Sequence, residues 1–192
     1  MTGINRVRRL CLVLCAGLAV SVSAIAQAAP RVKFQTTLGE FVVELNQEKA
    51  PVTVQNFLQY VKDKHYDGTI FHRVIDGFMI QGGGFIANMT EKPTRAPIVL
   101  EARNGLRNDR GTIAMARTRE PNSATAQFFV NVVDNNNLNA PQPDGNGYAV
   151  FGKVVSGMDT VDKIRSASTT SKGMFQNVPS APIVINSATL VK

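Results

Sequence analysis

The chain has 192 residues, of which 44% are hydrophobic, and it carries a formal net charge of +7 at neutral pH. A chain of this length can bury enough apolar surface to fold as one domain without disulfides, and its two cysteines lie near the N-terminus, at positions 11 and 15. The basic residues are scattered singly and are not interleaved with aromatic residues, so we expect no nucleic-acid partner.

The first 28 residues have the three-part pattern of a secretory signal peptide. Three arginines between positions 6 and 9 precede an apolar run over residues 10–22, and the small-residue segment AIAQAA follows. The apolar run is shorter than the roughly 20 residues that a membrane-spanning helix needs. A lipoprotein signal would use Cys15, but Leu14 before it is bulky where such signals have a small residue. We therefore expect cleavage after Ala28, or one residue later, and no stable insertion into a membrane.

Removal of this signal peptide would leave residues 29–192 as one secreted domain. Because the leader contains three arginines and no acidic residue, its removal lowers the formal charge from +7 to +4. The leader also takes both cysteines with it, so the mature domain has no disulfide or thiolate chemistry. We expect this domain to be a monomer.

The mature segment begins with a hairpin pattern followed by a helix pattern. RVKFQTT and EFVVEL alternate apolar and polar residues on either side of Leu38-Gly39, which predicts two antiparallel strands. After Pro51, a residue suited to a first helical turn, apolar residues occupy positions 54, 57, 58 and 61. Their spacing predicts an amphipathic helix with one face to bury.

Short strand patterns account for most of the remaining chain. They are, in order, YDGTIFHRVI, IVLEA, GTIAMA, QFFVNVV, YAVFGKVV and IVINSATLVK. A second helix is predicted over residues 158–165. Eight or so strands with only two helices indicate an all-β fold, and we predict a closed eight-stranded antiparallel barrel capped by the two α-helices. Residues 88–110 and 135–148 are predicted surface loops, which often carry function.

The residues available do not indicate a metal, phosphate or nucleophile site. His65 and His72 are the only histidines and no cysteine accompanies them in the mature domain, so a zinc centre is not expected. The GGGF segment at 82–85 lacks the Lys-Ser/Thr of a phosphate-binding loop, and no G-x-S-x-G motif is present. We therefore expect no metal and no cofactor, and structural roles for both histidines.

The segment FHRVIDGFMIQGG, residues 71–83, places one arginine among apolar residues. Strand alternation puts Phe71 and Arg73 on one face and His72 on the other. Phe78 and Met79 could then form an apolar wall beside the guanidinium. Taken alone, this pattern leaves open whether Arg73 is a functional residue or a solvated surface charge.

Three sequence blocks resolve that choice through a family resemblance. FHRVIDGFMIQGG, IAMARTREPNSATAQFFVNV and YAVFGKVVSGMDTVDKI resemble the cyclophilin peptidyl-prolyl cis-trans isomerases in order and approximate spacing. The resemblance covers nearly all of the mature chain. The tyrosine that opens the third block and the GMD that follows are most similar to the secreted, periplasmic type of Gram-negative bacteria. The resemblance implies an eight-stranded barrel with two helices closing its ends.

The resemblance also implies an active site and a class of partner. The implied catalytic residues are Arg73 and Gln81, and the implied substrate-binding residues are Phe78, Met79, Ala116, Arg117, Gln127, Phe129, Leu138 and Tyr148. Ala116 and Arg117 would act through their backbone. The partners would be proline-containing unfolded or extended polypeptides. Phe129 and Leu138 could instead be ordinary core residues, and Gln81 a turn residue.

The implied chemistry explains why the segment needs a cation and no acid. Rotation about a peptide bond meets a barrier of roughly 18 to 20 kcal/mol because twisting removes the amide resonance. The apolar residues would hold a proline ring, and Arg73 would donate a hydrogen bond to the prolyl nitrogen of the twisted amide. An alternative is a proline-peptide-binding chaperone or adhesion-type module in which catalysis is incidental.

The chain departs from the family pattern at three places. Asn137 stands where many members have tryptophan, Tyr148 stands where many have histidine, and the RTRE that begins at Arg117 replaces a typical NAG. Backbone contacts at Arg117 do not depend on its side chain, so we still expect isomerase activity. Asparagine offers far less apolar area than tryptophan, so we expect weak inhibition by cyclosporin.

The leader generates the first prediction. Material secreted from a Gram-negative host should begin at Ala29, or one residue later, because the charged, apolar and small-residue segments follow one another in the order that signal peptidase requires. N-terminal sequencing of the periplasmic fraction checks the cleavage position. Secreted protein that still contains Arg6 would contradict the prediction.

Overall fold

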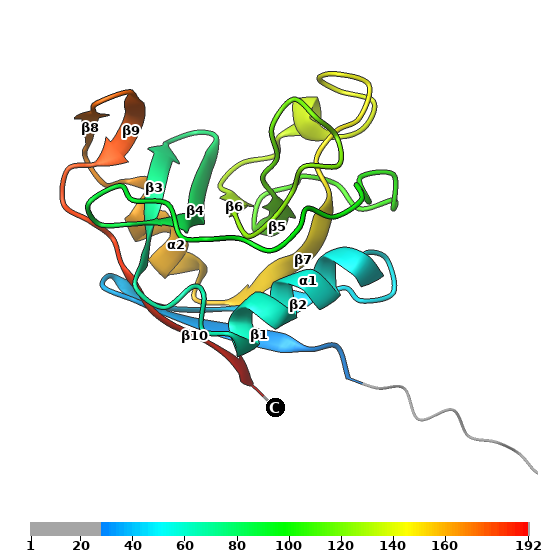
Figure 1. The fold of residues 1–192 in the computed structure, drawn as a ribbon, viewed down its shortest axis with the longest axis horizontal. Coiled ribbons are helices and arrows are strands. Elements are labelled where there is room, and N and C mark those ends of the chain that lie inside the picture. Colours follow the sequence, from blue (N-terminus) through cyan, green and yellow to red (C-terminus); the bar gives the residue numbers. More distant parts are fainter. Residues whose placement is uncertain (1–27, 192) are drawn as a thin grey trace, which may run out of the picture.

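A computed structural model describes residues 28–191 of the chain (Figure 1), and the predicted signal peptide, apart from Ala28, lies outside the described residues. The strands are β1 (Arg31–Thr36), β2 (Gly39–Leu45), β3 (Thr69–Ile75), β4 (Met79–Ile86), β5 (Thr112–Met115), β6 (Phe128–Asn131), β7 (Val150–Ser156), β8 (Thr169–Lys172), β9 (Phe175–Pro179) and β10 (Ile185–Val191). The helices are α1 (Pro51–Lys62), α2 (Met158–Arg165) and a short 3-10 turn, η1 (Asn136–Leu138). Within residues 28–191, no helix is both long and apolar enough to cross a membrane.

Eight strands form one antiparallel sheet in the order β10-β1-β2-β7-β5-β6-β4-β3. The all-β class, the eight strands and the two α-helices are confirmed, but the prediction of a closed barrel is wrong. The edges β3 and β10 meet only at an isolated bridge between Ile70 and Val184 and at a few backbone hydrogen bonds, such as that from Phe71 N to Ile183 O at 3.0 Å. The separate hairpin of β8 and β9 packs along β3 near this open edge.

Two other strand predictions need correction. The β8–β9 hairpin was not expected, since TTSK is polar and almost fully exposed and lacks an apolar period. The IVLEA segment was expected to be a strand, but it contributes only an isolated bridge between Ile98 and Ala124. Its Glu101 instead turns toward the start of α1, so tertiary contacts outweigh the β-propensity of the segment.

The concave side of the sheet encloses an aromatic core. The rings of Phe34, Phe57, Tyr66 and Phe128 lie with centroids 5.2 to 6.2 Å apart, in tilted and edge-to-face arrangements. The helix α1 buries Val54, Phe57 and Val61 against this core, which confirms three positions of the predicted stripe, and Leu58 is partly buried. The helix α2 packs against β2, β3 and β4.

A β-bulge in β3 reverses the expected orientation of the residues on either side of it. Phe71 pairs with Gly82, whereas Arg73 pairs with Gln81, so two steps along β3 match one step along β4. Because Gly82 and Gln81 are consecutive, their faces are opposite, and so are those of Phe71 and Arg73. The prediction that Phe71 and Arg73 share a face is therefore wrong: Phe71 enters the core and Arg73 lies on the outer face.

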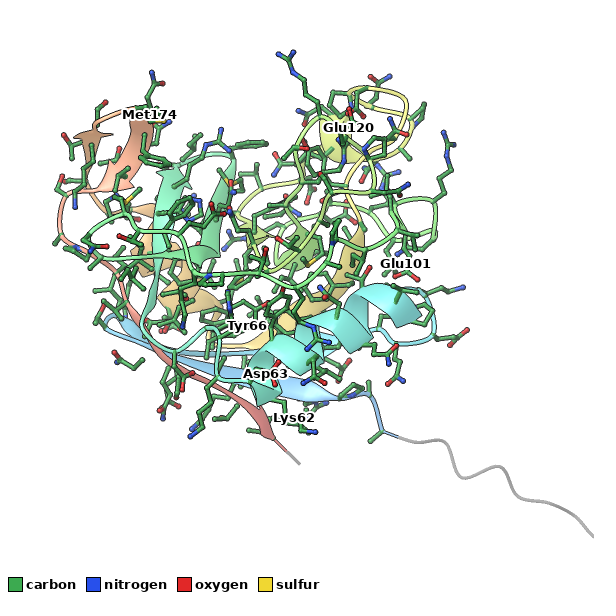
Figure 2. All side chains as sticks on the ribbon, in the orientation of Figure 1. Lys62, Asp63, Tyr66, Glu101, Glu120 and Met174 are labelled. Atoms are coloured by element: carbon green, nitrogen blue, oxygen red, sulfur yellow. The ribbon has the colours of Figure 1, made fainter. Side chains whose placement is uncertain are left out.

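The N-terminus of α1 is capped from a distant loop. Glu101 accepts hydrogen bonds from the backbone N–H groups of Val52, at 3.1 Å, and Thr53, at 2.8 Å, and from the Thr53 hydroxyl at 2.6 Å. Figure 2 shows Glu101 beside the first turn of the helix. The N-cap residue, Ala50, has no side-chain acceptor. A carboxylate at this position satisfies two free N–H groups and interacts favourably with the helix dipole.

This cap generates a stability prediction. Replacing Glu101 by alanine should lower the free energy of unfolding by about 1 to 2 kcal/mol, the usual contribution of a cap plus a dipole interaction. Urea denaturation followed by circular dichroism measures the change. Glu48→Ala is the matched control, since Glu48 is exposed and makes no side-chain hydrogen bond within residues 28–191. Equal stabilities of the two variants would show that the cap contributes nothing.

Candidate active site

The outer face of the sheet carries a second, smaller cluster that is separate from the barrel core. Across β3, β4, β6 and β5, the directly paired residues are Arg73, Gln81, Phe129 and Ala114. Directly paired residues of antiparallel strands project to the same face, so this row points outward. The adjacent row of Val74, Ile80, Val130 and Ile113 points into the core.

The outer cluster lies on the same face of the sheet as Arg73, and we call it the pocket because the residues that it gathers are those that the resemblance implies hold a proline ring. Its buried members are Met79, Ala114, Phe129, Leu138 and Val150, and its partly buried rim consists of Ile75, Phe78, Leu106, Ala116 and Tyr148. The structure thus brings together all of the predicted apolar site residues, which come from four separate parts of the chain. Sequence reasoning missed Ala114 and Val150, although strand alternation would have indicated both, since they lie two residues from the predicted Ala116 and Tyr148.

The polar residues predicted from the sequence also meet at this pocket. The Arg73 guanidinium donates from Nη1 to Gln81 Oε1 at 3.4 Å, and Gln81 Nε2 donates to Gln127 Oε1 at 3.0 Å. Arg73 is half-buried, and its described hydrogen-bond partner is this neutral amide rather than a carboxylate. Within the described residues, the Arg73 guanidinium therefore has no carboxylate partner that neutralises its charge.

The glycines at positions 83 and 84 give neighbouring side chains room to pack. A Cβ added to Gly83, whose φ is +86°, would lie 2.9 Å from the Tyr66 ring and 3.0 Å from the Phe128 ring. A Cβ added to Gly84 would lie 2.6 Å from the Gln127 side chain. The glycine run therefore serves close packing, as the sequence suggested, and not the binding of a phosphate.

Buried asparagines hold the loop that carries Leu138. Asn135 Nδ2 donates to the Phe78 carbonyl at 2.8 Å and to Asn131 Oδ1 at 2.7 Å. Asn108 Nδ2 donates to the Leu138 carbonyl at 3.3 Å and to the Tyr148 carbonyl at 3.4 Å. These bonds tie two walls of the pocket to one polar network, which satisfies buried amides that would otherwise destabilise the fold.

The Arg117 side chain has a structural role that the sequence did not reveal. It is 1% exposed, donates from Nη2 to Asp144 and to the Gly147 carbonyl, each at 2.8 Å, and its Cζ lies 4.5 Å from the centre of the Tyr148 ring. The Tyr148 ring in turn meets Phe129 edge to face at 5.7 Å. Arg117 lowers the pKa of Asp144 by hydrogen bonding to its carboxylate. We expected only backbone contacts here, but the side chain braces the pocket wall from behind.

Both histidines are structural in the described part of the chain. His65 Nε2 lies 3.1 Å from the Gly83 carbonyl, and burial lowers its pKa. His72 packs edge to face on Phe85, and burial, reinforced by the charge of Arg73, lowers its pKa to about 4. His72 is therefore neutral at neutral pH. Among residues 28–191, no group of three or more potential metal ligands comes together.

A hollow of about 740 Å³, lined by residues from segments 28–30, 44–48, 105–112 and 150–153, borders the outer cluster, with which it shares Leu106 and Val150. Its lining mixes basic residues such as Lys153 with acidic ones such as Glu48. It contains neither Arg73 nor either glutamine of the site. The shallow apolar cluster on the outer face, not this hollow, combines a fixed cation with an apolar wall.

The brace behind Tyr148 generates a prediction about binding. Arg117→Ala should speed amide hydrogen exchange across residues 140–148 and raise KM several-fold, because a loosened wall weakens ground-state and transition-state binding alike. We expect kcat to change by less than about twofold for the same reason. The control is Arg119→Ala, since the Arg119 side chain is exposed and unbonded within the described residues. Unaltered exchange in Arg117→Ala would refute the bracing role.

Comparisons with known proteins agree with this geometry. Residues 31–190 match the family model of cyclophilin type peptidyl-prolyl cis-trans isomerases. The peptidyl-prolyl cis-trans isomerase of Acinetobacter baylyi is 57% identical over 178 residues, which are 93% of each chain. Peptidyl-prolyl cis-trans isomerase B of Escherichia coli is 55% identical over 161 residues, which are 83% of this chain and 98% of that protein.

A solved structure supports the same assignment. The cyclophilin type peptidyl-prolyl cis-trans isomerase of Cryptosporidium parvum, crystallised in the presence of the dipeptide Ala-Pro, superposes with a TM-score of 0.73 at 27% identity. It covers 84% of this chain and 99% of its own. On these matches, and on the outer-face pocket that the motif residues form, the chain belongs to the cyclophilin-type peptidyl-prolyl cis-trans isomerases and is an enzyme of that class.

Proposed function

We propose that this enzyme accelerates Xaa-Pro bond rotation in extracytoplasmic proteins by non-covalent stabilisation of the twisted amide, with Arg73 as the catalytic residue. The observation that carries the proposal is the position of the Arg73 guanidinium. It lies half-buried beside an apolar pocket, on the same face as Phe129, with a neutral amide as its partner.

The reaction needs an electrostatic partner for a nitrogen whose properties change during rotation. In the planar amide the prolyl nitrogen shares its lone pair with the carbonyl, and a barrier of roughly 18 to 20 kcal/mol reflects the loss of that sharing. At the twisted geometry the lone pair returns to nitrogen and can accept a hydrogen bond. A guanidinium, which always carries donors, then stabilises the transition state more than either planar form.

The apolar pocket would hold the proline ring while the preceding residue rotates. Met79, Phe129 and Leu138 are at least 93% buried, so the ring would sit against fixed side chains rather than mobile ones. The same surroundings exclude water, which strengthens the interaction between the guanidinium and the prolyl nitrogen. Gln81 would orient the guanidinium, and Gln127 would hold the substrate backbone.

The proposed location is the periplasm, where the partners would be unfolded or extended proline-containing polypeptides. The signal-peptide pattern of residues 1–28 supports the location. The Acinetobacter relative matches 93% of this chain. Residues 28–192 alone make up a smaller share of the 192 residues, so the similarity continues into the leader. Uncatalysed Xaa-Pro isomerisation takes tens to hundreds of seconds, which is slow enough to limit folding.

The central test is the removal of the guanidinium. Arg73→Ala should lower kcat about 100- to 1000-fold, the scale of a deleted transition-state hydrogen-bond donor, with unchanged circular dichroism. A protease-coupled proline isomerisation assay on the mature protein measures the rate, and Arg119→Ala serves as the arginine control. Activity within threefold of the unmodified protein would refute the role of Arg73. Such a result would favour the alternative, a proline-peptide-binding module in which the apolar wall alone matters.

A further inference from the structure

Four side chains form a continuous line of hydrogen bonds across the active-site face. Arg73 Nη1 donates to Gln81 Oε1 at 3.4 Å, Gln81 Nε2 donates to Gln127 Oε1 at 3.0 Å, and Gln127 Nε2 donates to Glu91 Oε1 at 3.3 Å. Every bond in the line runs in the same direction. The line begins at a cation and ends at a carboxylate outside all three motif blocks.

The chemistry of the two ends determines how both amides are turned. A guanidinium can only donate, so Gln81 must present its oxygen to Arg73 and its NH₂ group to Gln127. An ionised carboxylate can only accept, so Gln127 must present its NH₂ group to Glu91 and its oxygen to Gln81. The requirements from the two ends agree. A half-turn of either amide would oppose donor to donor and acceptor to acceptor.

The backbone also prepares a place for this line. A Cβ on Gly84 would lie 2.6 Å from Cγ and Cδ of Gln127, so the side chain lies directly over the glycine. Gly84 is not among the glycines with positive φ, so alanine is compatible with its backbone conformation. The segment that carries Glu91 is fastened to the same strand by a bridge between Phe85 and Glu91 and by a hydrogen bond from Lys92 N to Gly84 O at 2.8 Å.

We propose that Glu91 is a positioning residue of the isomerase, which acts on Arg73 through Gln127 and Gln81. The inference rests on the proposed catalytic function of Arg73. The carboxylate holds the Gln127 amide in one orientation, Gln127 holds Gln81, and Gln81 holds the guanidinium toward the pocket. Two neutral amides separate the Arg73 guanidinium from the Glu91 carboxylate. Glu91 can therefore orient the guanidinium through them without forming an ion pair that would compete with the substrate.

A positioning role predicts which kinetic constant changes. Arg73 is proposed to interact with the prolyl nitrogen only in the twisted state, so a misdirected guanidinium slows the chemical step without weakening substrate binding. A residue that bound the substrate itself would instead change KM. The ratio of the two effects therefore separates indirect action through Arg73 from direct contact with the polypeptide.

Three variants of the mature protein break the line in different ways. Glu91→Ala removes the acceptor, Glu91→Gln keeps an oxygen but allows either amide orientation, and Gly84→Ala displaces Gln127 by steric contact alone. Glu120→Gln is the matched control, because Glu120 is an exposed carboxylate on another loop (Figure 2) with no side-chain hydrogen bond within the described residues. Each variant is made in the natural chain and in the Arg73→Ala background.

The expected results are specific to the proposal. In the natural chain, Glu91→Ala and Gly84→Ala should lower kcat about 5- to 10-fold, and Glu91→Gln should lower it about 2- to 3-fold. Because Gln127 is itself proposed to hold the substrate backbone, KM can also rise, but by a smaller factor than kcat falls. Glu120→Gln should leave both constants unchanged. In the Arg73→Ala background, the Glu91 and Gly84 variants should have no further effect on kcat, because residues that act through one group are not additive.

Other results overturn the inference in recognisable ways. If Arg73→Ala abolishes activity while Glu91→Ala stays within 1.5-fold of the natural enzyme, the positioning role is refuted and the proposed function stands. A change confined to KM, or an equal loss in the Arg73→Ala background, would show that Glu91 acts on substrate binding, directly or through Gln127, and not on Arg73. If Arg73→Ala itself remains active, the proposed role of Arg73 is refuted whatever the Glu91 variants show, so failure of the proposed function is distinguished from failure of this inference. Circular dichroism of each variant verifies the fold, and the Glu91 variants decide alone if Gly84→Ala does not fold.

Discussion

One extra residue in β3 decides which face of the sheet carries the chemistry. The bulge between Phe71 and Arg73 sends the phenylalanine into the aromatic core and the arginine to the outer face, although only one residue separates them. With regular alternation the guanidinium would enter the core beside Phe128, where an unpaired charge is very costly. The bulge thus lets a single strand contribute both to the core and to the site.

The sheet consequently acts as a wall between two apolar clusters with different tasks. The inner cluster is the larger of the two and stabilises the fold, whereas the smaller outer cluster gathers the predicted site residues. Because both clusters alternate along β4 and β6, the outer residues are placed by the same backbone hydrogen bonds that hold the core. A pocket built on paired strands keeps its geometry better than one built on loops alone, as transition-state binding requires.

The two long loops complete the pocket by locking onto each other. Arg103 of the first loop donates to the Gly145 carbonyl of the second at 2.8 Å. Asn108 N donates to Asn139 Oδ1 at 2.7 Å, and Asn135 N donates to the Asn108 carbonyl at 2.8 Å. The two loops are thus joined by both side-chain and backbone hydrogen bonds.

His72, beside Arg73 in the sequence, is buried and neutral at neutral pH, which agrees with a site that transfers no proton.

The amino-acid sequence by itself determined the local features and the family. The helix period predicted α1 and α2, with α2 over the same residues as in the structure, and the strand patterns predicted the all-β class. The three motif blocks identified the family because each is a contiguous run of residues, so that the blocks and their order can be read from the sequence without knowing the fold. Only the tertiary structure decided the features that join distant segments. Glu101 caps a helix 48 residues away, Arg117 braces a loop about 30 residues away, and Glu91 ends a line of bonds that begins on another strand. The open seam between β3 and β10 and the bulge at Arg73 belong to the same class. Sequence periodicity reports on neighbours along the chain, whereas these contacts depend on strand register, and register is set by the packing of the whole sheet.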